Sequence, residues 1–199
     1  ARQDGVAPEV QVALYEYGKS SLKAETGWIR QIQPLTQDLD KISEELFALR
    51  TNGGEEYCGW VIKCAVEELA WNPAADVYKA IFIAGNEPFT QGKVNYAESC
   101  KAAITKGIIV NTIHCGSQAD GVNTKWKDGA DLADGKYLVI DQNRAVVSIA
   151  TPLDKEIATL GVELNKTYLA YGVAGKVSAS RQVAQDANVA ALAPASGAV

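Results

Sequence analysis

Hydrophobic and polar residues alternate near the beginning of the chain. Val10, Val12 and Leu14 are each separated by one residue, which is the spacing of a strand with one buried face. We therefore expect a strand over residues 9–17. Apolar residues recur over residues 28–32 after a polar, turn-like stretch, so the two segments predict a hairpin with a long loop.

Helical spacing follows Pro34, which is expected to end the hairpin. A first helix is predicted to begin at Thr36, a residue suited to the N-cap, and its apolar side chains recur every three or four positions up to residue 49. Gly53 and Gly54 follow and stop this helix. A second stripe of apolar residues over 57–69 predicts a second helix.

Two runs of apolar residues are continuous rather than alternating. They cover residues 78–84 and 108–113, and a helical stripe over 94–107 separates them. A continuous run is typical of a parallel strand that is covered on both faces. These segments predict a β-α-β unit in the centre of a parallel sheet, followed by a short helix over 126–133 and an outer strand over 137–140.

Amphipathic helices are expected again near the end of the chain. Ile157, Leu160 and Leu164 mark one face of a helix that begins near residue 153, and residues 176–192 favour a further, alanine-rich helix. The chain is therefore divided into an α/β domain over residues 1–150 and a helical extension over 151–199. The expected fold class is α/β, with a doubly wound, mainly parallel, Rossmann-like sheet and one antiparallel edge strand.

Composition narrows the classes of function. The chain has 199 residues, of which 47% are hydrophobic, so one domain with a sizeable core is expected. Its formal net charge of −5 gives no general attraction for nucleic acid or anionic lipid. No apolar stretch is long enough to cross a membrane. Because the sequence contains no methionine, we expect a further segment before Ala1 in the natural protein.

Taken in order, the predicted segments resemble the von Willebrand factor A (vWA) family over about residues 7–142. The resemblance is carried by the hairpin over 9–32, Leu35-Thr36-x-Asp38-Leu39, Asn52-Gly53-Gly54, the strand over 79–84, Gly107-Ile108-Ile109-Val110, and a stretch from Trp126 through Leu132-Ala133 to Gly135-Lys136-Tyr137. It implies a module that binds protein partners, as part of an extracytoplasmic or surface-attached protein, rather than an enzyme.

The resemblance also implies a metal site that this sequence does not complete. The family's first strand carries Asp-x-Ser-x-Ser, which helps to hold a divalent cation, and we expect a missing N-terminal segment of about 40 residues to supply that central strand and its helix. Glu55 and Glu56 stand where the family has a threonine, and Gly85-Asn86 stands where it has an aspartate. Glu56, Asn86 and Glu87 remain as candidate ligands for Mg²⁺ or Ca²⁺. The alternative is that the two glutamates cap the next helix.

Ligands of an open parallel sheet meet the loops at the carboxyl ends of its strands. The predicted partner-binding rim consists of Glu55, Glu56, Tyr57, Asn86, Glu87, Phe89 and Ser117. The loop over residues 85–89 is its most distinctive part, because an amide, a carboxylate and an aromatic ring surround a proline there. A loop with a purely structural role is the alternative.

The cysteines leave two interpretations open. Cys58, Cys64, Cys100 and Cys115 lack the Cys-x-x-Cys spacing of a zinc site, and both buried free thiols and disulfides fit a chain of this kind. Right-handed crossovers would place Cys64 and Cys100 at similar heights on neighbouring helices, so we hypothesise a bridge between them. Cys58 and Cys115, both near the rim, are the second pairing.

Catalytic motifs do not emerge from the sequence. His114 and Cys115 are adjacent in a predicted strand, so their side chains point to opposite faces and cannot easily share a proton. Gly116-Ser117 lacks the second glycine of a nucleophile elbow, and Gly53-Gly54 lacks the rest of a phosphate-binding loop. We therefore expect no catalytic residue and no cofactor.

The expected function is that of a non-catalytic, adhesion-type vWA module with a degenerate metal site and a protein partner. The alternative is a Mg²⁺- or Ca²⁺-dependent adhesion module that the missing N-terminal segment completes.

Overall fold

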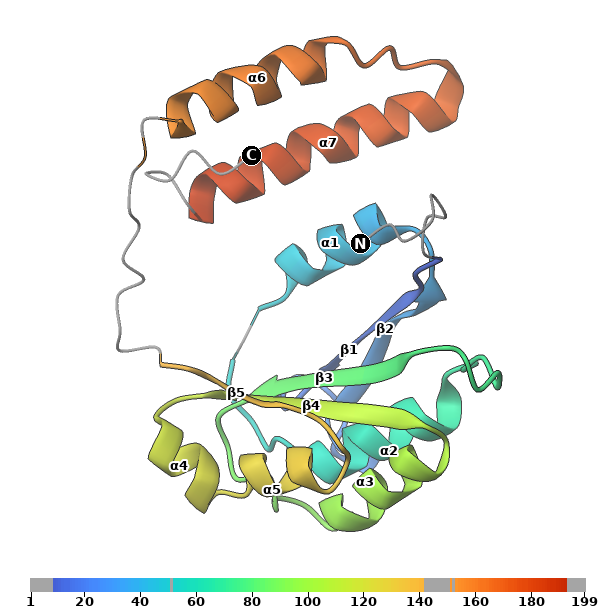
Figure 1. Ribbon diagram of the computed structural model, residues 1–199, viewed down its shortest axis with the longest axis vertical. Helices are drawn as coiled ribbons and strands as arrows, with labels where there is room; N and C mark the ends of the chain where they lie inside the picture. Colours follow the sequence, from blue (N-terminus) through green and yellow to red (C-terminus); the bar gives the residue numbers. More distant parts are fainter. Residues whose placement is uncertain (1–8, 51, 142–150, 152, 193–199) are drawn as a thin grey trace. The chain divides into compact units, whose positions relative to one another are not determined.

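A computed structural model describes residues 9–50, 52–141, 151 and 153–192 of the chain (Figure 1). The polypeptide divides into two compact units, a sheet unit of residues 1–37 and 50–144 and a helical unit of residues 38–49 and 145–199. The sequence placed the division near residue 150. The two divisions differ in one described element, the helix after the hairpin, which groups with the C-terminal helices.

The hairpin begins the sheet unit. Strand β1 (Val12–Tyr17) pairs antiparallel with β2 (Ile29–Thr36), and a short 3-10 helix, η1 (Ala24–Thr26), lies in the connection. The prediction that Pro34 ends the second strand is wrong, because β2 continues through it to Thr36. A proline is tolerated here because β2 is an edge strand, so its missing N–H can face away from β1.

A three-stranded parallel sheet forms the centre of the same unit. Its order is β3 (Lys79–Gly85), β4 (Ile108–Cys115) and β5 (Tyr137–Ile140), and β3 is paired with β4 along the whole of β3, from Lys79 with Ile108 to Gly85 with His114. The predicted mixed α/β architecture with a mainly parallel sheet is confirmed.

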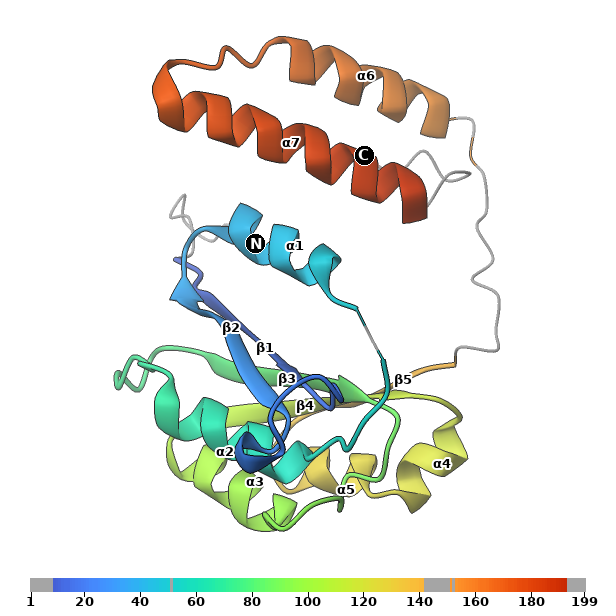
Figure 2. The ribbon, with the colours of Figure 1, turned by 180° about the vertical axis from the view of Figure 1, so that it is seen from behind.

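Helices cover one face of this sheet. They are α2 (Cys58–Glu68), α3 (Tyr96–Thr105) and α5 (Trp126–Asp131), and all three lie on the same side of the strands in both views (Figures 1 and 2). The core lies between the helices and the sheet. Its largest fully buried side chains are Trp126, Phe89, Ile62, Ile108, Val66, Val110, Thr112, Cys58 and Cys100.

The opposite face of the sheet is uncovered by any helix of the sheet unit's described residues. Phe82 of β3 is 65% exposed, and Leu138 and Ile140 of β5 are 47% and 55% exposed. The sequence predicted β3 as a central strand buried on both faces, and this is wrong for the described residues. A continuous apolar run shows that the side chains of a strand tolerate burial on both faces. It does not show that another element covers each face.

No hydrogen-bonded ladder joins the hairpin to the parallel sheet. The described strands form a two-stranded sheet, β1-β2, and a three-stranded sheet, β3-β4-β5, and no described strand lies between β1 and β3. The two sheets nevertheless belong to one compact unit, because the side chains of β1 pack on α2 and on the end of β3.

The helical unit consists of three described helices, α1 (Leu39–Ala48), α6 (Asp154–Lys166) and α7 (Gly172–Leu192). The N-cap of α1 is Asp38, which accepts the N–H of Lys41 at 2.9 Å, so the prediction that Thr36 caps this helix is wrong. Arg181 of α7 donates to Asp38 at 2.9 Å and joins the two helices. None of the described helices is both long and apolar enough to span a membrane.

The packing of the core gives a matched pair of substitutions. Phe89 is fully buried, whereas Phe82 is 65% exposed. We expect Phe89→Ala to lower the free energy of unfolding by about 3–5 kcal/mol, because it leaves a cavity beside Trp126 and Tyr96. Phe82→Ala should change it by less than about 1 kcal/mol. Urea denaturation of both variants measures this, and equal losses would contradict the description of the uncovered face.

Candidate functional site

The carboxyl ends of β1, β3 and β4 meet at one edge of the sheet unit, which we call the rim. The hydroxyl of Tyr17, the last residue of β1, donates to the carbonyl oxygen of Ala84 in β3 at 2.7 Å. Cys115 ends β4 and follows His114, the register partner of Gly85. The loops that follow these strands therefore lie together, as the parallel arrangement predicts.

A single carboxylate clamps the loop that follows β3. Oε2 of Glu56 accepts the backbone N–H groups of Asn86 at 3.2 Å and Glu87 at 3.4 Å. The clamp is reciprocal, because Oε1 of Gln91 accepts the backbone N–H of Glu56 at 2.8 Å. The charge on the carboxylate strengthens such hydrogen bonds. Glu56 thus organises the rim loop.

The other side of this loop is attached to the core. The indole Nε1 of Trp126 donates to the carbonyl oxygen of Glu87 at 2.9 Å, and the N–H of Phe89 donates to the carbonyl oxygen of Thr124 at 2.9 Å. The ring of Phe89 lies 4.9 Å from that of Trp126 and 5.4 Å from that of Tyr96. Phe89 is completely buried, so its predicted role as an exposed contact for a partner is wrong.

The remaining rim residues differ in what they present to solvent. Glu55, Asn86 and Ser117 are exposed, and Glu87 is half-buried. Ser117 also has a structural role, because its hydroxyl caps a helix that the sequence did not predict, α4 (Gln118–Asn123), by accepting the N–H of Asp120 at 3.1 Å. The spacing of Ser117 and Asp120 is the signal that could have revealed this helix.

Tyr57 belongs to an aromatic cluster that sequence reasoning missed. Its ring lies 5.2 Å from Trp28 and 6.4 Å from Trp60, and the ammonium of Lys93 lies 4.7 Å above the ring of Trp60. Trp28 has a positive φ of 51°, an uncommon backbone conformation for a bulky residue. Tyr57 and Trp60 lie three residues apart at the beginning of α2, whereas Trp28 comes from the hairpin, so the tertiary structure brings Trp28 to this pair.

Thiols near the rim are held in their neutral form. The Tyr17 hydroxyl lies 3.8 Å from Sγ of Cys58. Burial raises the pKa of Cys58 to about 12, and burial followed by the nearby Glu56 raises the pKa of Cys115. Burial and the neighbouring Cys58 also raise the pKa of Tyr17 well above its ordinary value. A thiol attacks as its thiolate, so this environment does not prepare a nucleophile.

All four cysteines are free thiols, so the hypothesised bridge between Cys64 and Cys100 is absent. Cys64 is partly exposed on α2 beside the carboxylate of Glu68, whereas Cys100 is buried on α3 and donates to the carbonyl oxygen of Gly129 at 3.5 Å. The two side chains therefore face different surroundings. Similar height on neighbouring helices did not fix the direction in which each side chain points. The alternative pair, Cys58 and Cys115, is not bridged either.

The three candidate metal ligands lie together in the rim loop but do not form a cation site by themselves. Two backbone N–H groups already point at Oε2 of Glu56, so the positive ends of two dipoles lie where a cation would approach. Nδ2 of Asn86 lies 3.5 Å from Oε1 of Glu87. Across the described residues no group of three His, Cys, Asp or Glu side chains is arranged to hold a metal ion.

His114 lies beneath the rim with neither ring nitrogen paired. Its side chain is 2% exposed, its ring lies 5.7 Å from that of Trp126, and no described residue accepts or donates a hydrogen bond to Nδ1 or Nε2. Burial lowers the pKa of His114, and the carboxylate of Asp120 opposes this shift. The imidazole is therefore a neutral core group, without the exposed partner that acid-base catalysis needs.

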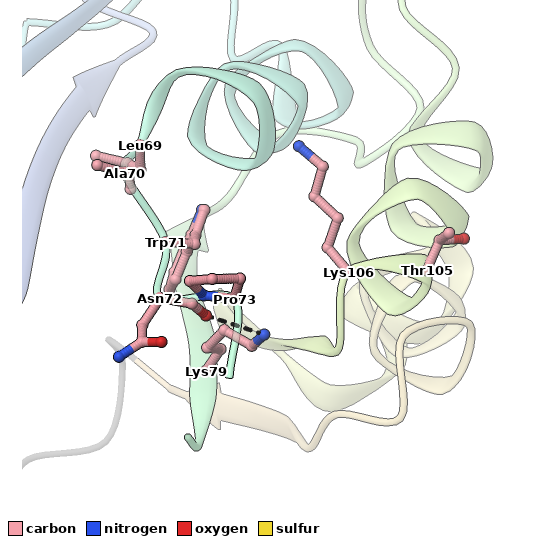
Figure 3. A pocket seen from close by; sticks show the side chains of 8 residues that line it. All are labelled: Leu69, Ala70, Trp71, Asn72, Pro73, Lys79, Thr105 and Lys106. Atoms are coloured by element: carbon pink, nitrogen blue, oxygen red, sulfur yellow. Dashed lines mark hydrogen bonds between the residues drawn. The ribbon is translucent and has the colours of Figure 1, made fainter. Parts of the chain in front are cut away.

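A hollow lies at the opposite end of the sheet unit, where α2 and α3 end and β3 begins (Figure 3). Its volume is about 460 Å³, and it is lined by Leu69, Ala70, Trp71, Asn72, Pro73, Lys79, Thr105 and Lys106. Both ammonium groups donate to backbone carbonyls, Lys79 to Asn72 at 3.3 Å and Lys106 to Val66 at 2.7 Å. These cations complete the ends of structural elements, so the hollow has no arrangement that suggests a reaction.

Comparison with solved structures identifies the fold. No family model and no curated protein matches the sequence. The structure is similar to an aerotolerance-related membrane protein from Bacteroides fragilis, with a TM-score of 0.50, 16% identity, and coverage of 70% of this chain and 75% of that chain. It is similar to the VWA domain of SpRpn10, with a TM-score of 0.50, 17% identity, and coverage of 68% and 67%. BatB from Bacteroides thetaiotaomicron also matches, with a TM-score of 0.48, 18% identity, and coverage of 68% and 73%. The chain therefore has a vWA-like fold over about two thirds of its length.

Substitution of two adjacent glutamates tests whether the Glu56 carboxylate holds the loop after β3. Glu56→Ala removes the acceptor of two backbone N–H groups, and we expect it to lower the free energy of unfolding by about 1.5–3 kcal/mol. It should also accelerate amide hydrogen exchange at Asn86 and Glu87. Glu55→Ala is the matched control, because Glu55 is exposed, and it should change stability by less than about 0.5 kcal/mol. Unchanged exchange in Glu56→Ala would show that the carboxylate does not hold the loop.

The buried imidazole predicts a pH dependence of stability. The folded state lowers the pKa of His114 from its ordinary value of 6.5, so the unfolded chain binds the proton more readily. The free energy of unfolding should therefore be highest above pH 6.5 and fall as the pH drops below it. His114→Phe cannot be protonated, and its stability should fall less between pH 7 and pH 5. Denaturation at several pH values measures both slopes, and parallel slopes would refute the assignment.

Proposed function

We propose that this chain is a non-catalytic protein-binding module of the vWA type, and that a partner contacts the exposed polar side chains of the rim. The observation that carries the proposal is the fixed loop after β3. Its backbone is held by Glu56 on one side and by Trp126 and Thr124 on the other, while the side chain of Asn86 stays exposed.

A fixed loop favours binding because little conformational entropy is lost when the partner docks. Glu56 holds the backbone N–H groups of Asn86 and Glu87, so the exposed side chain of Asn86 is not used by the clamp. Glu55 and Asn86 then present a carboxylate and an amide on a rigid base. Loops held on a scaffold in this way are the usual carriers of specificity.

The chemistry of the rim supports binding rather than catalysis. The two rim thiols, Cys58 and Cys115, are neutral because their pKa values are raised by burial, and His114 is buried without a partner among the described residues. A nucleophile and a base within reach of one another would be needed for acyl transfer. The two rim thiols and the buried imidazole do not form such a pair.

A degenerate metal site is part of the proposal. Glu56 is engaged by two N–H groups, and a hard cation needs several oxygens. The second candidate function is cation-dependent adhesion, which the proximity of the Asn86 and Glu87 side chains favours, because Nδ2 of Asn86 lies 3.5 Å from Oε1 of Glu87. It would require further ligands from outside the described residues. One of the similar structures is described as a membrane protein, and we extend an extracytoplasmic or surface-attached location to this chain as part of the proposal.

Affinity capture from an extract of the source organism tests the rim. We expect the double variant Glu55→Ala/Asn86→Ala to lose proteins that the wild-type chain retains, because both side chains are exposed and neither supports the clamp. The control Glu98→Ala/Lys101→Ala changes two exposed residues of α3 and should retain them. Identical captured proteins for the rim variant and the wild type would refute the proposed surface.

The same affinity capture measures whether partner binding depends on a divalent cation. Capture should persist in EDTA, and millimolar Mg²⁺ or Ca²⁺ should leave the melting temperature of the chain unchanged, because a ligand that binds the folded state raises it. Loss of capture in EDTA together with a raised melting temperature would replace the proposal with the cation-dependent alternative.

A further inference from the structure

The hollow in Figure 3 combines an apolar wall with two positive charges. Leu69, Trp71 and Pro73 form the wall, and the charges are those of Lys79 and Lys106. Figure 3 shows Trp71, Lys79 and Lys106 reaching the hollow from three segments, the connection after α2, the beginning of β3 and the end of α3. None of the described residues that line it is acidic. In a chain with a formal net charge of −5, the hollow is therefore a local site of positive charge.

Both ammonium groups retain hydrogen-bond donors for a ligand. An ammonium carries three N–H groups, and the described contacts use one of them in each lysine. Lys79 donates to the carbonyl oxygen of Asn72 at 3.3 Å, and Lys106 donates to that of Val66 at 2.7 Å. These contacts hold the two side chains beside the hollow, so less side-chain entropy is lost when a ligand binds.

The apolar wall is fixed by hydrogen bonds on its own backbone and ring. The indole Nε1 of Trp71 donates to the carbonyl oxygen of Ala65 at 2.8 Å, and its backbone N–H donates to the carbonyl oxygen of Leu69 at 2.9 Å. Oδ1 of Asn72 accepts the N–H of Ala74 at 2.9 Å, which closes a turn at the end of this segment. Trp71 also packs against the hydrophobic core. The wall is therefore formed before any ligand arrives, as is usual for a small-molecule site.

The helix ends beside the hollow favour a singly charged ligand. α2 ends at Glu68 and α3 ends at Thr105, and the last carbonyl groups of a helix carry partial negative charge. These carbonyl groups repel a phosphate dianion more strongly than a carboxylate of single charge. The apolar wall adds a preference for a carboxylate that is attached to an apolar group. The volume of about 460 Å³ lies in the range of sites for small ligands.

We infer that the hollow binds a carboxylate attached to an apolar group, with the carboxylate at Lys79 and Lys106 and the apolar group against Trp71. Two sources supply this chemistry, a free organic acid and the last residue of a polypeptide. The hollow and the rim lie at opposite ends of the sheet unit, so this site is separate from the proposed partner surface.

An NMR titration of the whole chain with N-acetylphenylalanine tests the inference. The readout is the indole N–H signal of Trp71, which is assigned from its loss in Trp71→Phe. We expect a saturable shift of this signal. N-acetylphenylalaninamide has the same apolar group without the charge, so it should bind more weakly by about tenfold or more. Inorganic phosphate should also bind more weakly than N-acetylphenylalanine.

Two lysine variants test the charged side of the hollow. Lys79→Gln and Lys106→Gln each remove a charge but keep an N–H donor for the backbone carbonyl. Each should weaken the binding of N-acetylphenylalanine by about threefold or more, and the double variant by about tenfold or more. Lys63→Gln is the matched control, because Lys63 is exposed on α2 outside the hollow, and it should bind as the wild type does. Circular dichroism and melting curves show that each variant is folded.

The tetrapeptide Gly-Gly-Gly-Phe with a free carboxylate distinguishes the two sources. Tighter binding of this peptide than of N-acetylphenylalanine would identify the end of a polypeptide as the ligand. Weaker binding of the peptide would identify a free acid, because the added backbone then hinders entry.

Four results would overturn the inference. They are the absence of a saturable shift at Trp71, equal binding of N-acetylphenylalanine and its amide, tighter binding of phosphate, and unchanged affinity in the folded double variant. An equal loss of affinity in Lys63→Gln and Lys79→Gln would also contradict it, because the attraction would then come from net charge and not from the hollow.

Discussion

The side chain of Trp126 joins the core to the rim, and the arrangement of the sheet unit depends on it. Its ring is completely buried against Phe89 and lies beside His114, and its Nε1 holds the carbonyl of Glu87. Its own carbonyl accepts the hydroxyl of Thr112 in the middle of β4 at 2.8 Å. One residue of α5 thus fixes a strand, a helix and the loop after β3. The rim loop is rigid because its anchor is part of the hydrophobic core.

Satisfaction of backbone groups explains the other features of this edge. Glu56 accepts the N–H groups of Asn86 and Glu87, and Tyr17 donates to the carbonyl of Ala84. In both places a side chain completes a hydrogen bond that no backbone partner makes. These contacts stabilise the end of β3 where the sheet is interrupted, because an unpaired backbone group that loses water is costly. The same contacts remove Glu56 from the set of available metal ligands.

Local patterns predicted the elements well where the pattern itself causes the structure. The strand over residues 137–140 was placed correctly, and the two apolar runs became β3 and β4. The predictions were wrong at positions where the tertiary structure determines which residues form a strand or cap a helix. Pro34 lies on an edge strand, where its missing N–H has no cost, and Asp38 displaced Thr36 as the helix cap because its side chain reaches the N–H of Lys41.

The rim was predicted as a location but only partly as a set of residues. Parallel strands bring their carboxyl ends together, and this topological rule correctly placed Glu56, Asn86 and Glu87 in one loop contact. Whether a residue of such a loop points outward depends on the core below it. Phe89 turns inward because Gly129 leaves room for its ring, since a Cβ at residue 129 would lie 2.3 Å from that ring. No pattern around Phe89 itself contains this information.

The uncovered face and the interrupted sheet have one physical origin. A parallel strand is stable when both its edges are paired and both its faces are covered, and the described residues give β3 one paired edge and one covered face. Phe82 is exposed on the uncovered face although it lies in an apolar run. The apolar pattern records which side chains tolerate burial, so it predicts the strand but not which neighbouring layers are present.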